Sequence, residues 1–170
     1  SGETAIGKYP VEAIKVMANI SSVMLLDQDK KKKSIIQSTN EVEGMAVAVK
    51  NLSLSLPITK IITITISGFA ARIISSQMLP QPIIAVSNNK NLARGFNLYS
   101  GTKGVFFNTK FYKDSLKHIP FCLHHLWKKK EINKKDMILL ITLGYPGSGR
   151  RMNTLQTHYV KDLAKNFSWV

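Results

Sequence analysis

The sequence is poor in cysteine and in long apolar runs, and each shortage excludes a class of protein. Cys122 is the only cysteine, so no internal disulfide can form, which favours a reducing, cytoplasmic compartment. The longest apolar candidate, residues 137–143, falls well short of the roughly 20 residues that a membrane helix needs. Because the chain opens at Ser1 without an initiator Met or a basic and then apolar leader, we expect a fragment of a longer protein and no signal peptide.

Acidic side chains are also scarce. Only 10 Asp and Glu stand against 24 Lys and Arg, which gives a formal net charge of +14, typical of proteins that bind phosphate groups. The lysines are nevertheless scattered, and none of their short runs is interleaved with aromatic residues on which bases could stack. We therefore favour a lysine-rich solvated surface over a nucleic-acid partner. A hydrophobic content of 44% in 170 residues predicts a folded domain with its own core.

Motifs that carry catalysis or bind metals are missing. The sequence has no Walker motif, no GxGxxG and no paired carboxylates. His118 and His125 are spaced to share a helix face, but no third ligand follows at metal-binding spacing, so we expect structural or solvent-facing roles for them and for His124. Cys122 lies in an apolar stretch without a base placed against it, which predicts a buried packing residue.

Short apolar runs rich in β-branched residues alternate with helical patterns along most of the chain. Strands are predicted at residues 61–66, 82–86, 104–107, 137–142 and 155–160, the last as an edge strand. Helices are predicted from a capping pair at Asn40 and Glu43 up to Pro57, and at residues 69–78, 89–100 and 115–127. This alternation predicts an α/β fold with helices on the faces of a sheet.

The amino-terminal segment follows a different pattern. Pro10 opens a helix in its first turn, and Val11, Ile14 and Met17 begin an apolar face. A polar, lysine-rich stretch then predicts a linker, with the domain boundary near residues 27–38. The chain is therefore divided into residues 1–30 and residues 31–170.

The turn after the first predicted strand is one candidate binding site. Unpaired backbone N–H groups at the start of the following helix favour an anion. Gly68 would allow close approach of a phosphate, while Thr65 and Ser67 would add hydroxyl donors. The alternative is a plain strand-to-helix turn, which is common in α/β folds.

The loop of residues 144–154, which reads GYPGSGRRMNT, is a second candidate. Its glycines and proline mark a tight loop, and Arg150 and Arg151 place two bidentate anion donors at its end. Ligands of open α/β sheets bind beyond the carboxyl ends of the strands. If the two preceding strands are neighbours, the two loops could clamp one phosphorylated ligand; the alternative is a long hairpin loop with exposed arginines.

Four segments resemble the pyruvate kinase family in order and spacing. They read SGETAIGKYPVEAIKVM (1–17), ISGFAARIIS (66–75), PIIAVSNNKNLARGFNLYSGTKGVFF (82–107) and KKDMILLITLGYPGSGRRMNT (134–154). The resemblance covers almost the whole chain. It implies that residues 1–30 are the last loop and helix of a (β/α)8 barrel with a linker, and that residues 31–170 form the family's C-terminal, allosteric domain. That domain would be a three-layer αβα structure with a mixed five-stranded sheet.

The family transfers phosphate from phosphoenolpyruvate to ADP, giving pyruvate and ATP, with Mg²⁺ and K⁺. The resemblance places the catalytic lysine, the metal-binding acids and the phosphate-binding arginine upstream, in barrel segments outside this chain. We therefore expect the 170 residues alone to be inactive. The expected role is regulation and assembly, with the upstream barrel of the same enzyme as a partner, in a cytoplasmic homotetramer.

The resemblance also implies an effector site for a sugar phosphate or nucleotide. In many members the strand-to-helix turn holds one phosphate, and the loop after the penultimate strand folds over the same effector. These roles carry over to Thr65, Ser67, Gly68, the backbone of Phe69 and Ala70, and to Gly147, Ser148, Gly149 and Arg150. Lys129 falls near the position of an arginine that holds a second phosphate.

Two departures from the family pattern affect this site. Ala70 lacks the usual hydroxyl, and Phe69 stands where a polar or basic residue is common. Each lost donor to a charged group costs about 1.5–3 kcal/mol, or roughly ten- to hundredfold in affinity. We therefore expect weakened effector binding, or a different phosphate such as AMP or ribose 5-phosphate.

Two other interpretations stay open. The chain could be a basic, non-catalytic α/β domain that binds phosphate or nucleic acid, in which case its retention on DNA or RNA should fall steeply with salt. It could also be a gene remnant that folds poorly without the barrel surface, an interpretation that a cooperative thermal melt would argue against.

Overall fold

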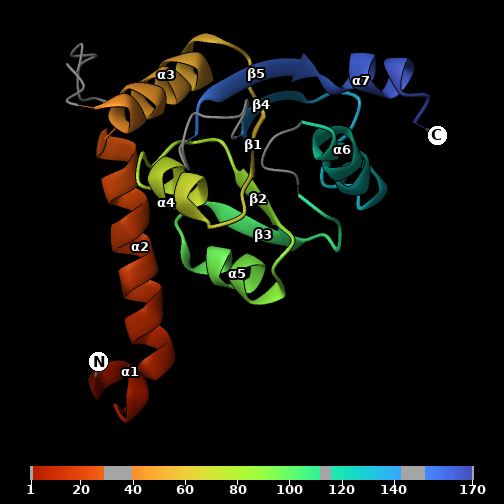
Figure 1. Cartoon of the computed structure of the whole chain (residues 1–170). Helices are drawn as coiled ribbons and strands as arrows, with labels where there is room; N and C mark the ends of the chain where they lie inside the picture. Colours follow the sequence, from red (N-terminus) through yellow and green to blue (C-terminus); the bar gives the residue numbers. More distant parts are fainter. Residues whose placement is uncertain (1, 29–39, 112–115, 143–151, 170) are drawn as a thin grey trace. The chain divides into compact units, whose positions relative to one another are not determined.

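A computed structural model of the chain describes residues 2–28, 40–111, 116–142 and 152–169. The chain divides into two compact units, Ser1–Ile36 and Gln37–Val170, and the second unit holds the sheet (Figure 1). Among the described residues, no helix is both long enough and apolar enough to cross a membrane.

The second unit is built on a mixed five-stranded sheet in the order β3-β2-β1-β4-β5. Its strands are β1 (Lys60–Ile64), β2 (Ile83–Ser87), β3 (Thr102–Phe106), β4 (Met137–Thr142) and β5 (Thr154–Tyr159). The first four are parallel, and β5 pairs antiparallel with β4 at one edge. The fold class and the mixed sheet are therefore confirmed, and the strand predicted at the edge lies there.

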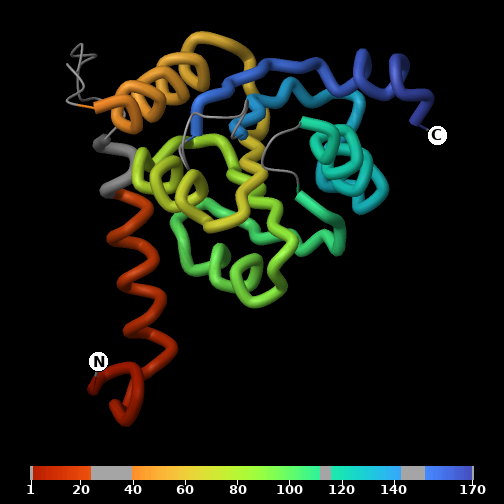
Figure 2. Tube along the Cα trace, in the orientation of Figure 1, coloured from red at the N-terminus to blue at the C-terminus, as the bar shows by residue number. Residues whose placement is uncertain are grey.

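Helices cover both faces of this sheet, which makes three layers (Figures 1 and 2). Successive strand residues point to opposite faces, so Ile61 packs into one core cluster and Ile62 into the other. The Ile61 face is covered by α3 (Glu41–Ser55), α4 (Phe69–Ser75) and α5 (Lys90–Gly95). The Ile62 face is covered by α6 (His118–Lys128) and α7 (Val160–Asn166). Burial on both faces explains why the central strands read as continuous apolar runs.

Element ends differ from the prediction where side chains compete with the helical backbone. Asn40 caps α3 as predicted, because its side chain accepts a hydrogen bond from the Glu43 N–H at 3.0 Å. The helix predicted to reach residue 78 ends at Ser75, since the Ser75 and Ser76 hydroxyls bond back to carbonyls in the last turn.

Two further helical segments in the structure differ from the sequence prediction. The predicted helix at residues 89–100 is α5 followed by a short 3-10 helix, η1 (Phe96–Leu98). The short helix α7 escaped prediction because Tyr159, at its N-cap, forms no side-chain cap hydrogen bond and so leaves no start signal.

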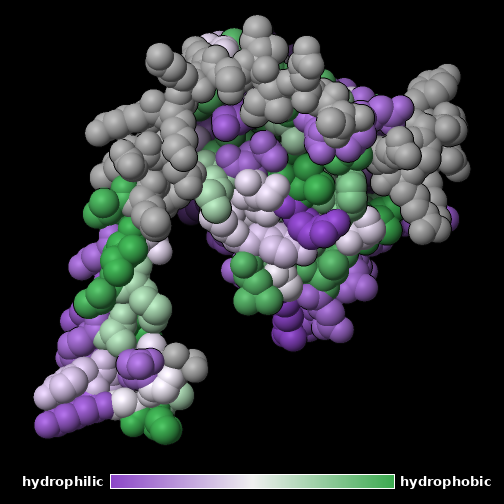
Figure 3. All heavy atoms as spheres, turned by 90° about the vertical axis from the view of Figure 1, so that its left-hand side faces the viewer, coloured by the Kyte–Doolittle hydropathy of each residue, from purple (hydrophilic) through white to green (hydrophobic). Residues whose placement is uncertain are grey.

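The first unit contains α1 (Gly2–Ala5) and α2 (Pro10–Gln28), and Pro10 stands in the first turn as predicted. The apolar face is far from buried: Val11, Ile14 and Met17 are 57%, 56% and 51% exposed. Apolar side chains line the exterior of this unit in the space-filling view (Figure 3). The described part of the unit thus leaves an apolar helix face uncovered.

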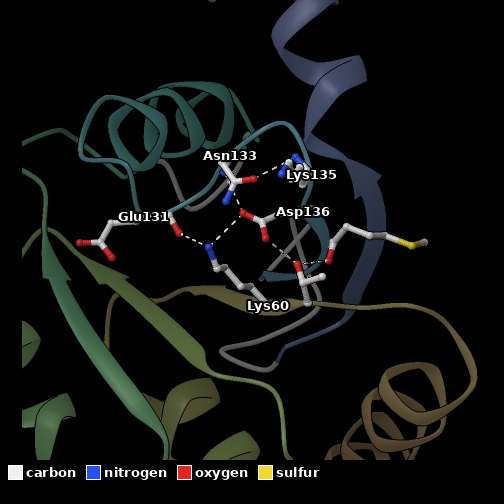
Figure 4. Close-up of polar contacts among 7 residues, drawn as sticks. Lys60, Glu131, Asn133, Lys135 and Asp136 are labelled. Atoms are coloured by element: carbon white, nitrogen blue, oxygen red, sulfur yellow. Dashed lines mark hydrogen bonds and ion pairs between the residues drawn. The ribbon is translucent and has the colours of Figure 1, made fainter.

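A part-buried ion pair joins the starts of β1 and β4 (Figure 4). Lys60 Nζ lies 2.9 Å from Asp136 Oδ2 and donates to the Glu131 carbonyl at 2.7 Å. The Asp136 carboxylate also accepts from the Thr59 hydroxyl at 2.8 Å and from the Asn133 N–H at 2.7 Å. Burial alone would raise the pKa of Asp136, but these donors outweigh it and the pKa lies below its ordinary value.

Candidate anion-binding site

The strands that precede the two candidate loops are neighbours in the sheet. β1 pairs with β4 in parallel register, with Thr63 beside Ile141. Chain connections leave this pair in opposite directions, because β2 and β3 extend the sheet on one side and β5 on the other. The carboxyl edge between β1 and β4 is therefore the topological switch point, where open α/β sheets bind ligands. The two candidate loops therefore follow neighbouring strands, which is the condition under which both could contact one phosphorylated ligand.

The turn after β1 is held by hydrogen bonds within itself. The Thr65 hydroxyl is buried and accepts from the Gly68 N–H at 2.9 Å. Ser67 is exposed, and its hydroxyl accepts from the Phe69 N–H at a long 3.4 Å. Thr65 thus fixes the turn, while Ser67 is only weakly held and faces solvent.

Gly68 is required by both the backbone and the packing of this turn. Its φ of 79° is left-handed, a conformation that side chains disfavour. A Cβ at this position would lie 2.8 Å from the ring of Phe96 and 3.2 Å from Leu92. The turn is therefore seated against α5 and η1, and glycine is the residue that fits there.

The start of α4 offers backbone donors to this edge. Within the described chain, no acceptor is recorded for the N–H groups of Ala70 and Ala71, as is usual in a first helical turn. Ala70 itself is 7% exposed, so the residue that replaces the family's hydroxyl packs into the core. The Gly68 and Phe69 N–H groups donate within the turn, so Ala70 and Ala71 carry the N–H groups without a recorded acceptor, and Ala70 adds no hydroxyl.

One charged residue near the turn was not identified from the sequence. The guanidinium of Arg72 lies 5.8 Å from the centre of the Phe69 ring and is exposed. A cation over an aromatic face is attracted to it. The sequence does indicate this contact, because Phe69 and Arg72 are three residues apart on one helix and their side chains therefore share a face.

The second candidate loop falls mostly outside the described residues. Gly147, Ser148, Gly149 and Arg150 all belong to that part, so their predicted role stays a prediction. Thr142, the last residue of β4, is described: its hydroxyl is buried and has no hydrogen-bond partner in the described structure.

Lys129 is not brought to the turn. It caps the carboxyl end of α6, and the next two residues, Lys130 and Glu131, line a cavity with the starts of β1, β2 and β3. The end of α6 therefore lies at the amino edge of the sheet, whereas Thr65 and Gly68 follow the carboxyl end of β1.

The histidines and the cysteine take packing roles. His118, His124 and His125 stack on Phe111, Trp169 and Phe107, with ring centres 5.0, 5.6 and 4.2 Å apart. Cys122 is fully buried, and burial raises the pKa of its thiol to about 12, as expected of a packing residue. In the described ranges, no three His, Cys, Asp or Glu side chains gather as a metal site would require.

Comparison with known proteins identifies the family. Residues 43–158 match the family model described as pyruvate kinase, alpha/beta domain. Relatives named pyruvate kinase include those of Staphylococcus saprophyticus, 34% identical over 97% of this chain, and Methanocaldococcus jannaschii, 32% identical over 94%. A third, from Staphylococcus aureus, is 31% identical over 98% of the chain.

These alignments cover only part of the relatives. The chain spans 29% of the S. saprophyticus protein and 35% of the M. jannaschii protein, so it corresponds to about a third of their length. The family model, the relatives and the five-stranded αβα fold agree. The chain belongs to the pyruvate kinase family and contains its C-terminal α/β domain.

Proposed function

We propose that this chain is the regulatory and assembly part of a pyruvate kinase, an enzyme that transfers phosphate from phosphoenolpyruvate to ADP with Mg²⁺ and K⁺. The proposal rests on one observation above all: the turn at Thr65–Gly68 stands at the switch point beside β4, where the N–H groups of Ala70 and Ala71 have no recorded acceptor among the described residues. An effector phosphate would bind there. The groups expected to bind this phosphate are the Ser67 and Thr65 hydroxyls and the backbone of Gly68, Phe69 and Ala70.

The geometry refines which parts of this site contribute. Since Thr65 already accepts from the Gly68 N–H, it shapes the turn, and exposed Ser67 offers the more accessible hydroxyl. Arg72 adds a positive charge beside Phe69, at the position where the family more often has a polar residue. We do not include Lys129, because α6 ends at the opposite edge of the sheet.

Catalysis is assigned to the upstream barrel and not to these 170 residues. Phosphoryl transfer needs positioned metal ions and cationic clamps, and we expect the residues that supply them to lie upstream of this chain, as the family resemblance implies. In an assay coupled to lactate dehydrogenase, the purified chain should show no turnover of phosphoenolpyruvate and ADP above the buffer control. Turnover that persists after rigorous purification would contradict this assignment.

Effector binding can be tested by placing a charge in the turn. Ser67→Asp puts a carboxylate at an exposed position and should weaken binding of ribose 5-phosphate or AMP by at least about tenfold in calorimetry. Gly68→Asp is a poorer test, because its side chain would meet Phe96 and could unfold the domain. Ser67→Asn is the matched control, since it has similar size and no charge. Equal binding by Ser67→Asp and Ser67→Asn would contradict an effector phosphate at this turn.

Assembly is proposed through two surfaces that the described residues leave uncovered. The apolar face of α2 would pack on the upstream barrel, and the free side of edge strand β5 would pair with another copy of the chain. Analytical ultracentrifugation should show self-association that rises with concentration. A strictly monomeric chain at every concentration would contradict assembly through this domain alone.

A further inference from the structure

A cavity of about 520 Å³ opens at the amino edge of the sheet, at the other end of the strands from the turn. Lys60, Ile83 and Lys103, at the starts of β1, β2 and β3, line three of its sides. Lys130 and Glu131, in the connection from α6 to β4, line another. Its volume lies within the range of pockets that hold metabolites. Four separate segments thus meet around one space.

The wall of this cavity is positively charged. Of its three lysines, Lys60 is paired with Asp136 and Lys103 with Glu131, so among the described residues Lys130 supplies the excess positive charge. Glu131 orients two of the lysines: its carboxylate accepts from Lys103 Nζ at 2.6 Å, and its backbone carbonyl accepts from Lys60 Nζ at 2.7 Å. Figure 4 shows that the Glu131 side chain points away from Lys60 while its carbonyl faces it.

These lysines keep donors for a ligand. An ammonium group has three N–H donors; two are recorded in use on Lys60 and one on Lys103. The Lys130 side chain has neither a hydrogen bond nor an ion pair to any described residue. Lys60 is 22% exposed, and its ammonium group is positioned by hydrogen bonds to the Glu131 carbonyl and the Asp136 carboxylate before anything binds.

Lys130 stands in a conformation that lysine does not favour. Its φ is 57°, and its N–H bonds to the Trp127 carbonyl while the Glu131 N–H bonds to the Leu126 carbonyl. This is the helix ending in which glycine is the usual residue, because a side chain there is strained. Lysine at this helix end adds a positive charge to the rim of the cavity, which glycine would not supply.

We propose that this amino-edge cavity binds a small phosphorylated metabolite, with its phosphate held by Lys103 and Lys130 next to the fixed charge of Lys60. Lysine ammonium groups bind the oxygens of a tetrahedral phosphate as compact point charges, and three lysines line this cavity. The cavity is larger than a phosphate ion, so it has room for an organic part beside Tyr99. This site is separate from the turn at Ser67, and it does not depend on effector binding there.

The test uses the full chain and two defined probes, pyrophosphate and ribose 5-phosphate, in calorimetry at physiological ionic strength. Binding is measured in the Ser67→Asp variant, so that the turn does not contribute. We expect saturable binding that falls at least about tenfold in Lys103→Gln/Lys130→Gln. The control Lys134→Gln/Lys165→Gln removes the same charge from exposed lysines outside the cavity and should change affinity by less than about threefold.

A single variant separates the binding role from a structural one. Lys130→Gly removes the charge and relieves the left-handed strain, so the melting temperature should rise while affinity for ribose 5-phosphate falls about tenfold. Unchanged affinity in Lys130→Gly, equal losses in the two double variants, or no saturable binding of either probe would overturn the proposal. Binding to the wild type that Ser67→Asp abolishes would place the ligand at the turn instead, which overturns this proposal and supports the effector site.

Discussion

At the carboxyl edge of the sheet, Gly68 turns the chain with a φ of 79° and the start of α4 presents backbone N–H groups. At the amino edge, Lys60, Lys103 and Lys130 present side-chain ammonium groups around a cavity. The first arrangement comes from neighbours in the sequence and can be seen as a motif. The second is assembled from distant segments by the strand order. The local backbone motif therefore lies at the carboxyl ends of the strands, whereas the lysines gather at their amino ends.

The largest effect is expected where the amino edge depends on a buried charge. Lys60→Met would leave the Asp136 carboxylate, which is 8% exposed, without its cation, and for this part-buried pair we expect a loss of about 3 kcal/mol, the low end for buried pairs. Urea unfolding at neutral pH measures this loss. The double variant Lys60→Met/Asp136→Asn should recover part of it; a loss below about 1 kcal/mol in the single variant would show that the pair is not structurally important.

Gly68→Ala tests whether the carboxyl edge depends as strongly on backbone shape. Left-handed strain and the contact of its Cβ with the Phe96 ring should together cost about 2–3 kcal/mol in the free energy of unfolding. Gly101→Ala is the control, because Gly101 also has a left-handed φ, of 61°, but a Cβ there would meet open space. Equal losses in the two variants would mean that strain alone matters and that the packing on Phe96 does not.

The amino edge should make the stability of the domain depend on pH, because the Asp136 carboxylate lies there. The Asp136 pKa is lowered in the folded state, so its stabilising effect is present above the ordinary value near 3.8 and is lost as the pH falls through the lowered folded value. Asp136→Asn should therefore cost about 2 kcal/mol at pH 7 and progressively less in acid. Urea unfolding as a function of pH measures this convergence. A gap that stays constant down to strongly acidic pH would contradict the role assigned to the carboxylate.

The smallest effect is expected at Ser67. Its hydroxyl makes only a 3.4 Å hydrogen bond and is exposed, so Ser67→Ala should change the free energy of unfolding by less than about 0.5 kcal/mol. Thermal denaturation without ligand provides the measurement. A clear loss would show that the hydroxyl holds the turn, a part that the structure gives to Thr65.

Much of the fold could be predicted because the strands are marked by their own residues. Residues 61–64, 83–86 and 137–142 are buried on both faces and, apart from Thr63 and Thr142, apolar, as is typical of buried parallel strands. Helix ends were less predictable where serine hydroxyls bond back to carbonyls, as at Ser75. The α7 helix could not be found because nothing caps its start.

The candidate sites differ in how far they could be predicted, depending on whether their residues are neighbours in the sequence. Thr65, Ser67 and Gly68 are adjacent in sequence, so the turn could be located before the structure was known. The neighbourhood of β1 and β4 could only be stated as a condition, because strand order depends on tertiary packing. Lys60, Lys103 and Lys130 lie in different elements and belong to no motif, so their meeting around one cavity left no local signal.

Cys122 gives the molecule a built-in reporter of unfolding. It is the only thiol in the chain, it is fully buried in the core cluster under α6, and its pKa of about 12 keeps it protonated. A thiol reagent can therefore react only with molecules whose core has opened. The labelling rate in native buffer would follow the population of open molecules, without denaturant, in every variant described above. Comparing those rates with and without a phosphate ligand would convert binding at either edge into a measurable delay of thiol modification.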